Sequence, residues 1–239
     1  MIIKWILFLV LLSHAYCILN QDFGLDFIQT ARLHGYEPEE HSVTTSDGYI
    51  LRLLRIPHGL NDTYYPRRPV LLIQSGLFEL PDTFIIRGTL LSPGFYIVNN
   101  GYDVWFSCSR GSVYSRNHTT FDPDTDSEFW DFSFPDLIND HYANIEYILN
   151  HTGVSSVSFL GYSGGASTIF TSFATDNEWF RTRVNLFISI EPLLILNNML
   201  GLPRFGFSSS LPWKLLRNMN INEFPFNNPI ANGTAQSTI

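Results

Sequence analysis

The sequence predicts an α/β domain with a doubly wound, mostly parallel sheet that starts with a β-hairpin. Two features predict this fold class. A hairpin signal is followed by alternating strand-like and helix-like segments, and the apolar run at residues 157–160 leads into Gly-x-Ser-x-Gly and then into small residues that suit a helix. With 239 residues and 45% hydrophobic content, the chain is long enough to bury the core of one such domain.

The N-terminal segment predicts a secretory signal peptide over residues 1–17. Lys4 precedes a short apolar run, and Ala15 and Cys17 follow at the −3 and −1 positions of a cleavage site. The run is shorter than a bilayer span, so no transmembrane segment is expected. Cleavage after Cys17 leaves Cys108 as the remaining cysteine, which predicts a buried small hydrophobic residue rather than a disulfide or a reactive thiol.

Composition restricts the class of partner. The chain carries 14 basic and 22 acidic residues and a net charge of −8, without a Lys/Arg cluster. A neutral or apolar partner is therefore expected, and a nucleic acid is not. No motif predicts a cofactor or a metal site, and the sequence does not indicate an oligomeric state. Four sequons for N-glycosylation fit a secretory route. They begin at Asn61, Asn117, Asn150 and Asn232.

The first half of the mature chain predicts one helix and four strands. An amphipathic helix is expected over residues 22–35, where apolar side chains recur at helical spacing before a glycine. The Asp47-Gly48 pair is a hairpin turn signal between two strands, and two continuous apolar runs predict buried parallel strands. The four expected strands are residues 40–45, 49–56, 70–73 and 102–106.

The second half continues the alternation of helices and strands. A helix is expected over residues 136–149, whose apolar side chains fall on one side. The run before the serine motif and residues 184–190, which end before Pro192, are the last two expected strands. Residues 197–239 contain no strand-like run and one helix-like segment at 212–219.

The Gly-x-Ser-x-Gly motif makes Ser163 the candidate nucleophile. In a strand, tight turn and helix, the serine hydroxyl is exposed at the edge of the sheet. Gly161 and Gly165 let the strand and helix backbones approach where any Cβ would clash. The strand-like run before the motif and the small residues after it favour such a turn over a loop that shares the same letters.

Several separate segments agree in order and spacing with one protein family. They are Ser46-Asp47-Gly48-Tyr49-Ile50-Leu51, Arg55-Ile56-Pro57-His58-Gly59, Gly76-Leu77, Asp82-Thr83-Phe84, Gly101-Tyr102-Asp103-Val104-Trp105, Ser109-Arg110-Gly111, Tyr114-Ser115-Arg116 with His118, and Glu128-Phe129-Trp130-Asp131-Phe132-Ser133. On these blocks the chain resembles the acid lipase family of α/β-hydrolases, which includes gastric lipase and lysosomal acid lipase. The resemblance covers about residues 22–200 and weakens beyond them.

The resemblance implies an α/β-hydrolase fold and a division of the chain. Residues 18–196 would form a partial hydrolase core, within which 22–80 is a lipase-associated N-terminal region. Residues 197–239 would begin the lid or cap that covers the site in this family. With the last strands and most of the cap missing, the chain is expected to be truncated at its C-terminus relative to the family.

The resemblance also implies an activity and a location. A family member would be a secreted or lysosomal ester hydrolase that acts on neutral lipids, either triacylglycerols or sterol esters, at a lipid droplet surface. Position by position, Ser163 matches the nucleophile of the family. The backbone N–H groups of Leu77 and Gly164 match the oxyanion hole, which stabilises the charge of the tetrahedral intermediate.

The sequence departs from the family pattern around this serine. The family has histidine where this chain has Ser75 and Tyr162, and glutamine where it has Gly164. These replacements keep the backbone donors, although Gly164 makes its own backbone more flexible. The family triad continues with an acid and a histidine after the serine. Here all seven histidines precede Ser163, namely His14, His34, His41, His58, His118, His141 and His151.

Structural roles are expected for other conspicuous residues. His118 lies in the Tyr-Ser-Arg block and His141 on the helix before the serine motif, so both are interpreted as packing residues. Glu191 ends the last expected strand and is interpreted as a surface or turn carboxylate, because an orienting acid without a histidine has nothing to orient.

Three hypotheses for function follow from these residues. The first is a family lipase with a serine nucleophile, represented by a chain that lacks the triad acid and histidine. The second is a non-catalytic secreted lipid-binding relative, and the third is a remnant without a lipid role. Both of the first two keep the serine motif, and the first is favoured because a non-catalytic binder would not need the whole motif. A continuing reading frame with a late Asp and a late His would favour the first.

Overall fold

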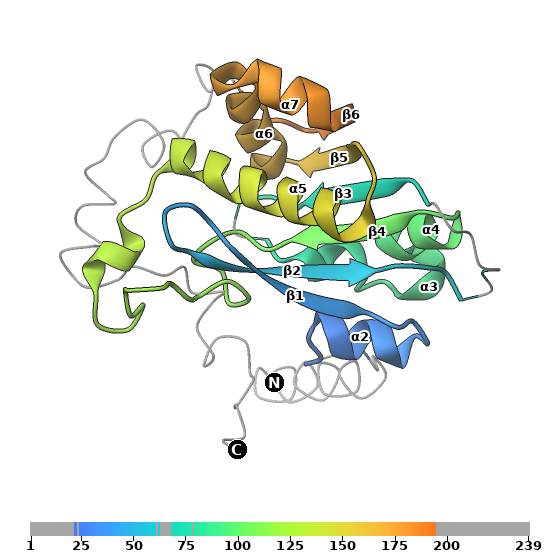
Figure 1. The fold of residues 1–239 in the computed structure, drawn as a ribbon. Coiled ribbons are helices and arrows are strands. Elements are labelled where there is room, and N and C mark those ends of the chain that lie inside the picture. The colour runs from blue at the N-terminus through green and yellow to red at the C-terminus, as the bar shows by residue number, and fades with distance from the viewer. Residues whose placement is uncertain (1–21, 23, 61, 63–67, 78, 195–239) are drawn as a thin grey trace, which may run out of the picture.

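The computed structural model describes residues 22, 24–60, 62, 68–77 and 79–194 (Figure 1). Six strands in this part of the chain form one sheet in the order β1-β2-β4-β3-β5-β6. The strands are β1 (Glu39–Thr44), β2 (Ile50–Ile56), β3 (Val70–Gln74), β4 (Asp103–Ser107), β5 (Val157–Tyr162) and β6 (Val184–Ile190). All six expected strands are therefore present, each within a residue or two of its predicted bounds.

The N-terminal part of the sheet is antiparallel. The pairs β1-β2 and β2-β4 run antiparallel, and the turn between β1 and β2 contains Gly48 with φ 98°, which favours glycine. Helix α2 (Phe27–Leu33) precedes the hairpin and is shorter than the predicted 22–35. The reason is a capping box, in which Asp26 accepts from the N–H of Gln29 at 2.8 Å and fixes the helix start.

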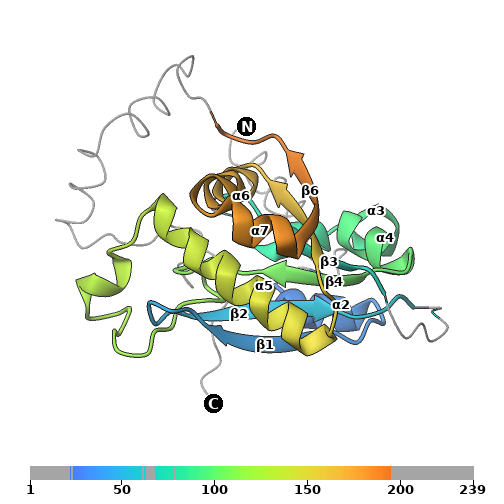
Figure 2. The same ribbon diagram turned by 45° about the horizontal axis from the view of Figure 1, so that its top comes forward.

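The other strands are parallel, and two helical layers cover them (Figure 2). Side chains of β3 alternate between two cores, which explains why its sequence is continuously apolar. Leu71 and Ile73 pack with α2 and α4 (Pro93–Asn99), whereas Val70 and Leu72 pack in the core of the opposite face. The helices on that face are α5 (Ile138–Thr152), α6 (Gly164–Thr175) and α7 (Asn177–Arg183).

Short helices occur in segments without a helical pattern in the sequence. Besides α4 and α7, they are η1 (Pro81–Phe84), α3 (Gly88–Leu91), η2 (Ser127–Trp130) and η3 (Phe134–Leu137). The expected helix 136–149 is thus split, because its first turn is the 3₁₀ helix η3 and α5 extends to Thr152. The signal peptide and the cap segment 197–239 lie outside the described residues.

Arg110 joins the hairpin turn to α5. Its side chain is completely buried and donates to Asp47 at 2.7 and 3.1 Å and to Asp140 at 2.8 Å. The guanidinium also lies over the ring of Tyr49, 4.0 Å from its centre. Burial raises the pKa of Asp140 to about 6 although Arg110 opposes that shift. One cation therefore holds two elements that are far apart in the chain.

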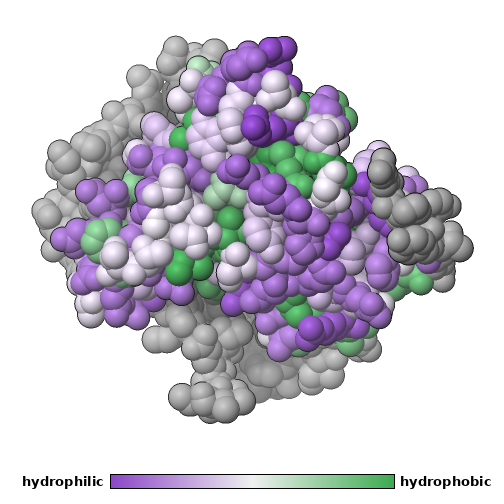
Figure 3. Space-filling model, in the orientation of Figure 1, coloured by the Kyte–Doolittle hydropathy of each residue, from purple (hydrophilic) through white to green (hydrophobic). Residues whose placement is uncertain are grey.

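Strand β6 forms one edge of the sheet in the described part of the chain. Phe187 packs into the core of α5, α6 and α7, but Leu186, Ile188 and Ile190 are 53%, 37% and 41% exposed. Their face of β6 therefore lacks a covering element among the described residues. On the side of the molecule seen in Figure 1, by contrast, the surface is mainly polar and its apolar residues lie in small separate areas (Figure 3).

Candidate active site

Ser163 is the single residue between strand β5 and helix α6. Its backbone has φ 51° and ψ −119°, a conformation that residues other than glycine rarely adopt. The turn is held from both sides. The Ser163 N–H donates to the carbonyl of Ile190 at 2.8 Å, and the Ser163 carbonyl accepts from the N–H groups of Ala166 and Ser167 at 3.1 and 3.2 Å.

The glycines of the motif allow α6 to lie directly on the ends of two strands. A Cβ on Gly161 would lie 2.5 Å from Cα of Ala166. A Cβ on Gly165 would lie 2.6 Å from the carbonyl oxygen of Gln74 and closer still to that of Ser75. Real side chains do not tolerate such contacts with backbone atoms, so both positions require glycine for this packing.

The two expected oxyanion-hole residues meet beside Ser163. A Cβ on Gly164 would lie 2.8 Å from the backbone nitrogen of Leu77, so these two backbones are in direct contact. The loop that carries Leu77 is closed by Glu79. Its carboxylate accepts from the Gly76 N–H at 3.1 Å, its own N–H donates to the Gly76 carbonyl at 3.1 Å, and its carbonyl accepts from the Ser75 hydroxyl at 3.2 Å.

The histidines that the structure describes are engaged away from Ser163. His141 is buried against α6, 2.8 Å from the Ser172 hydroxyl, and burial lowers its pKa to about 3. His118 contacts the Asp47 carbonyl at 2.9 Å, and His41 contacts Tyr147 at 3.0 Å. No described side chain forms a hydrogen bond with the Ser163 hydroxyl, so none of the described residues is positioned as its base.

Two carboxylates act on Tyr162; the sequence identifies Glu191 as a surface or turn carboxylate, which its exposure and turn conformation confirm, but it does not single out Glu79. Glu191 and then Glu79 raise the pKa of the Tyr162 phenol by their negative charge. Glu191 has φ 50°, and the nearby Leu193 and Leu194 are exposed. No local motif marks Glu79 as a site residue. Its one feature in the sequence is its place three residues after Gly76.

The remaining predicted residues lie away from the serine. Asn117 and Asn150 are exposed, as glycosylation requires, whereas Asn61 and Asn232 lie outside the described residues. Cys108 is buried and unpaired, as expected of a small hydrophobic residue. Trp130 and Phe132 pack against a small core around Tyr49.

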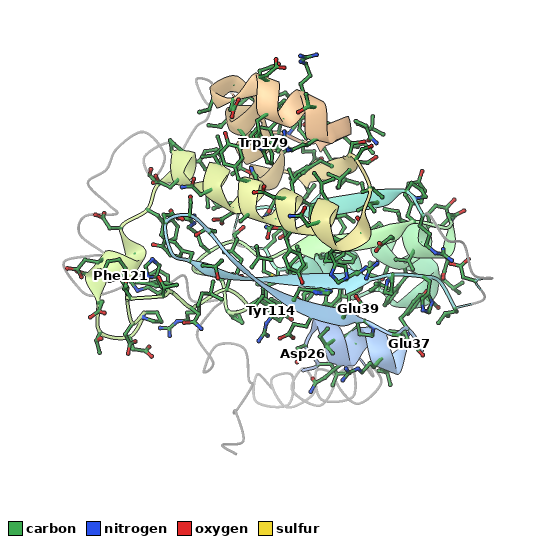
Figure 4. All side chains as sticks on the ribbon, in the orientation of Figure 1. Asp26, Glu37, Glu39, Tyr114, Phe121 and Trp179 are labelled. Carbon is green, nitrogen blue, oxygen red and sulfur yellow. The ribbon has the colours of Figure 1, made fainter. Side chains whose placement is uncertain are left out.

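One group of side chains in the described chain has the composition of a metal site. Ligand atoms of Glu39, His41 and His151 lie within 4.8 Å of one another. Glu39 is among the side chains labelled in Figure 4. However, Nη1 of Arg55 is 2.7 Å from Glu39 and 3.4 Å from Nε2 of His151. Two bonds from Arg55 to Asp103, at 2.8 and 2.7 Å, hold this guanidinium in place. The space between the three ligands therefore already holds a cation.

Proteins that are similar to this chain in sequence are lipases. A family model of the partial α/β-hydrolase lipase region matches residues 27–88. Gastric triacylglycerol lipase of Bos taurus is 32% identical over 221 residues, which cover 85% of this chain and 55% of that protein. Lysosomal acid lipase/cholesteryl ester hydrolase of Homo sapiens is 37% identical over 161 residues, which cover 66% of this chain and 40% of that protein. The chain spans about half the length of the curated relatives it matches.

Solved structures show the same fold. An esterase of Pyrococcus furiosus superposes with a TM-score of 0.51 at 14% sequence identity. The aligned part covers 84% of this chain and 68% of the esterase. Brefeldin A esterase, a bacterial homologue of human hormone sensitive lipase, has a TM-score of 0.50 at 15% sequence identity. Here the aligned part covers 81% of this chain and 50% of the esterase. These likenesses confirm the predicted α/β-hydrolase fold.

No helix in the described part of the chain is long and apolar enough to cross a membrane.

Proposed function

Because the chain belongs to the acid lipase family of α/β-hydrolases, we propose that it is a carboxylic ester hydrolase of neutral lipids with Ser163 as nucleophile. Triacylglycerols and sterol esters are the proposed substrates, since the similar proteins are named for them. One observation carries the proposal. Ser163 occupies a strained turn directly beside the contact between the backbones of Leu77 and Gly164.

The proposed chemistry is acyl transfer through the serine. The Ser163 oxygen bonds to the ester carbonyl carbon while a general base takes the hydroxyl proton. The N–H groups of Leu77 and Gly164 stabilise the negative charge on the former carbonyl oxygen. The bond to the alcohol then breaks, and the proton passes to the departing alkoxide. Water hydrolyses the acyl-enzyme by the same steps and releases the fatty acid.

The base is the part of this mechanism that the described residues do not supply. A serine hydroxyl near pH 7 is a weak nucleophile without a positioned imidazole. Removing that imidazole from a triad lowers turnover by a factor on the order of 10⁶. Fast hydrolysis therefore requires an imidazole from outside the described residues. The same observation favours the alternative, a non-catalytic lipid-binding relative that keeps the serine turn.

One experiment separates the two functions. The purified 239-residue chain and a Ser163→Ala variant are assayed with p-nitrophenyl butyrate and with emulsified triolein, and both are tested for co-flotation with the emulsion. Rapid turnover that disappears in the variant supports the hydrolase. Flotation of both proteins with at most trace turnover supports the lipid-binding alternative. A chain that neither floats nor hydrolyses contradicts both.

We also propose that the chain enters the secretory pathway and carries N-glycans. The exposed side chains of Asn117 and Asn150 support this proposal, and gastric and lysosomal relatives suggest a secreted or lysosomal location. Expression in a secreting cell followed by N-glycanase treatment is expected to increase electrophoretic mobility. Asn117→Gln and Asn150→Gln should each remove one step of that shift. A cytosolic product without a shift would contradict the proposal.

A further inference from the structure

Two glutamates from different parts of the chain flank Ser163. Glu79 reaches it from the loop after β3, where the Gly76 N–H donates to its Oε2 at 3.1 Å. A Cβ on Gly76 would lie 2.7 Å from that Oε2 and 3.2 Å from Cβ of Ser163. The carboxylate of Glu79 and the side chain of Ser163 therefore border the same position beside Gly76.

Glu191 approaches from the end of β6. It directly follows Ile190, whose carbonyl accepts the Ser163 N–H at 2.8 Å. Its φ of 50° is rare for a residue with a long side chain and turns the chain at this point. Both glutamates act on Tyr162, the neighbour of Ser163, because their charges are the two largest causes of its raised pKa. Both carboxylates therefore lie close enough to Tyr162 for their charges to act on its phenol.

Among the described residues, no cation is paired with either carboxylate. In the described part of the chain, neither Glu79 nor Glu191 forms an ion pair with a lysine, arginine or histidine. Glu79 is also half-buried, so solvent screens it less than a fully exposed group. The two carboxylates therefore contribute a negative potential to the region around Ser163.

We propose that Glu79 and Glu191 determine the charge preference of this site, which accepts esters that are neutral next to the scissile bond and disfavours esters that are anionic there. The inference rests on the proposed function, because it concerns the substrate class of the same serine. A neutral acyl chain has no charge to repel, whereas a nearby carboxylate on the substrate would be repelled by both glutamates. The same repulsion favours release of an ionised fatty acid product.

The kinetic test compares two esters that differ in charge, p-nitrophenyl butyrate and mono-p-nitrophenyl glutarate. Glu79→Gln, Glu191→Gln and the double variant remove the charges, and the glutamine amide oxygen can still accept from the Gly76 N–H. The preference for the neutral ester, as a ratio of kcat/KM values, is expected to fall about tenfold in the double variant. Glu178→Gln on α7, which removes an exposed charge that is paired with Arg181, is the matched control and should leave the ratio unchanged.

A second measurement does not depend on catalysis. Ultraviolet difference titration of each protein against its Tyr162→Phe counterpart reports the pKa of Tyr162, which should fall in both glutamate variants. If esters are hydrolysed but the ratio stays constant, the inference is overturned while the proposed function stands. If no ester is hydrolysed, the proposed function fails, and the charge preference falls with it because it concerns the same esters. The titration tests the premise separately: an unchanged pKa of Tyr162 in both glutamate variants would show that the two charges do not act at this site, and would overturn the inference even where esters are hydrolysed.

Discussion

At the scale of single residues, the packing of α6 on the sheet depends on positions where a methyl group has no space. Gly165 is the strictest, because the carbonyl oxygens of Gln74 and Ser75 lie where its Cβ would be. Gly165→Ala is therefore expected to reduce the free energy of unfolding by about 2–3 kcal/mol, since the clash is with backbone and not with a flexible side chain. Urea denaturation followed by circular dichroism measures it.

A matched control is available in the same protein. Gly153 ends α5 with φ 71°, a Cβ placed on it would have nothing within 4 Å, and asparagine tolerates this backbone. Gly153→Asn should change the free energy of unfolding by less than about 1 kcal/mol. Equal stability of the Gly165→Ala variant and the wild type would show that α6 can move away from β3.

His141 gives the fold a pH dependence of defined sign. Its pKa is lowered from 6.5 to about 3 by burial, so the folded state keeps it neutral where the unfolded chain takes up a proton. This contribution to stability is complete above pH 6.5 and is lost as the pH falls toward 3. Between about pH 6.5 and 4.5 it amounts to about 2–3 kcal/mol. Wild type should lose that much more stability than His141→Gln over this range.

The comparison is made by urea denaturation at several pH values. His58→Gln serves as the control, because the side chain of His58 is exposed. Parallel stability curves for wild type and His141→Gln would mean that burial does not lower the pKa of His141 in the folded protein.

At the scale of elements, the connection between the hairpin and α5 depends on one buried cation. Arg110→Leu would leave Asp140 buried without its partner, and this is expected to reduce the free energy of unfolding by about 3–5 kcal/mol. Arg181, on α7, makes an ion pair with Glu178 in which both side chains are mainly exposed, at 64% and 79%. Arg181→Ala should therefore change stability by less than about 1 kcal/mol.

A double variant tests the physical reason. If the loss in Arg110→Leu comes from the unpaired charge of Asp140, then Arg110→Leu combined with Asp140→Leu should recover part of it. A double variant less stable than the single one would instead assign the loss to the packing of the arginine over Tyr49.

Which elements the sequence predicts depends on their length and burial. The strands and α5 are long apolar or periodic segments, and they lie where the sequence places them. Helices α4 and α7 have seven residues each, too few for a helical period to stand out. The predicted start of α2 is wrong because the cap at Asp26, and not the apolar pattern before it, sets the first residue of the helix.

The candidate site shows a similar limit. The serine turn and its glycines are contiguous in the chain, so a motif predicts them. Glu79 and Glu191 come to Tyr162 from loops after two different strands, and only the order of strands in the sheet brings them together. No spacing in the sequence predicts that Glu79 and Glu191 both lie near Tyr162, because this arrangement depends on tertiary structure.

At the scale of the whole molecule, the face of β6 that no described residue covers should govern association of the 239-residue chain. Leu186, Ile188 and Ile190 are exposed side by side on an edge strand, an arrangement that favours pairing with other chains. Ile188→Lys is expected to increase the soluble, monomeric fraction severalfold, as measured by size-exclusion chromatography with light scattering. Leu33→Lys, an exposed leucine on α2, is the control. Equal effects of the two variants would show that net charge alone matters.

The contact between Leu77 and Gly164 has a consequence for how the protein folds. Neither residue can reach the other until β3 has paired with β5, and that parallel pairing closes a long loop that includes β4 and α5. Long-range parallel pairing is a slow step in folding. The proposed oxyanion donors would thus come together late on the folding pathway, after the local hairpin and helices have formed. During refolding, recovery of lipid binding or hydrolysis should lag behind recovery of helical structure.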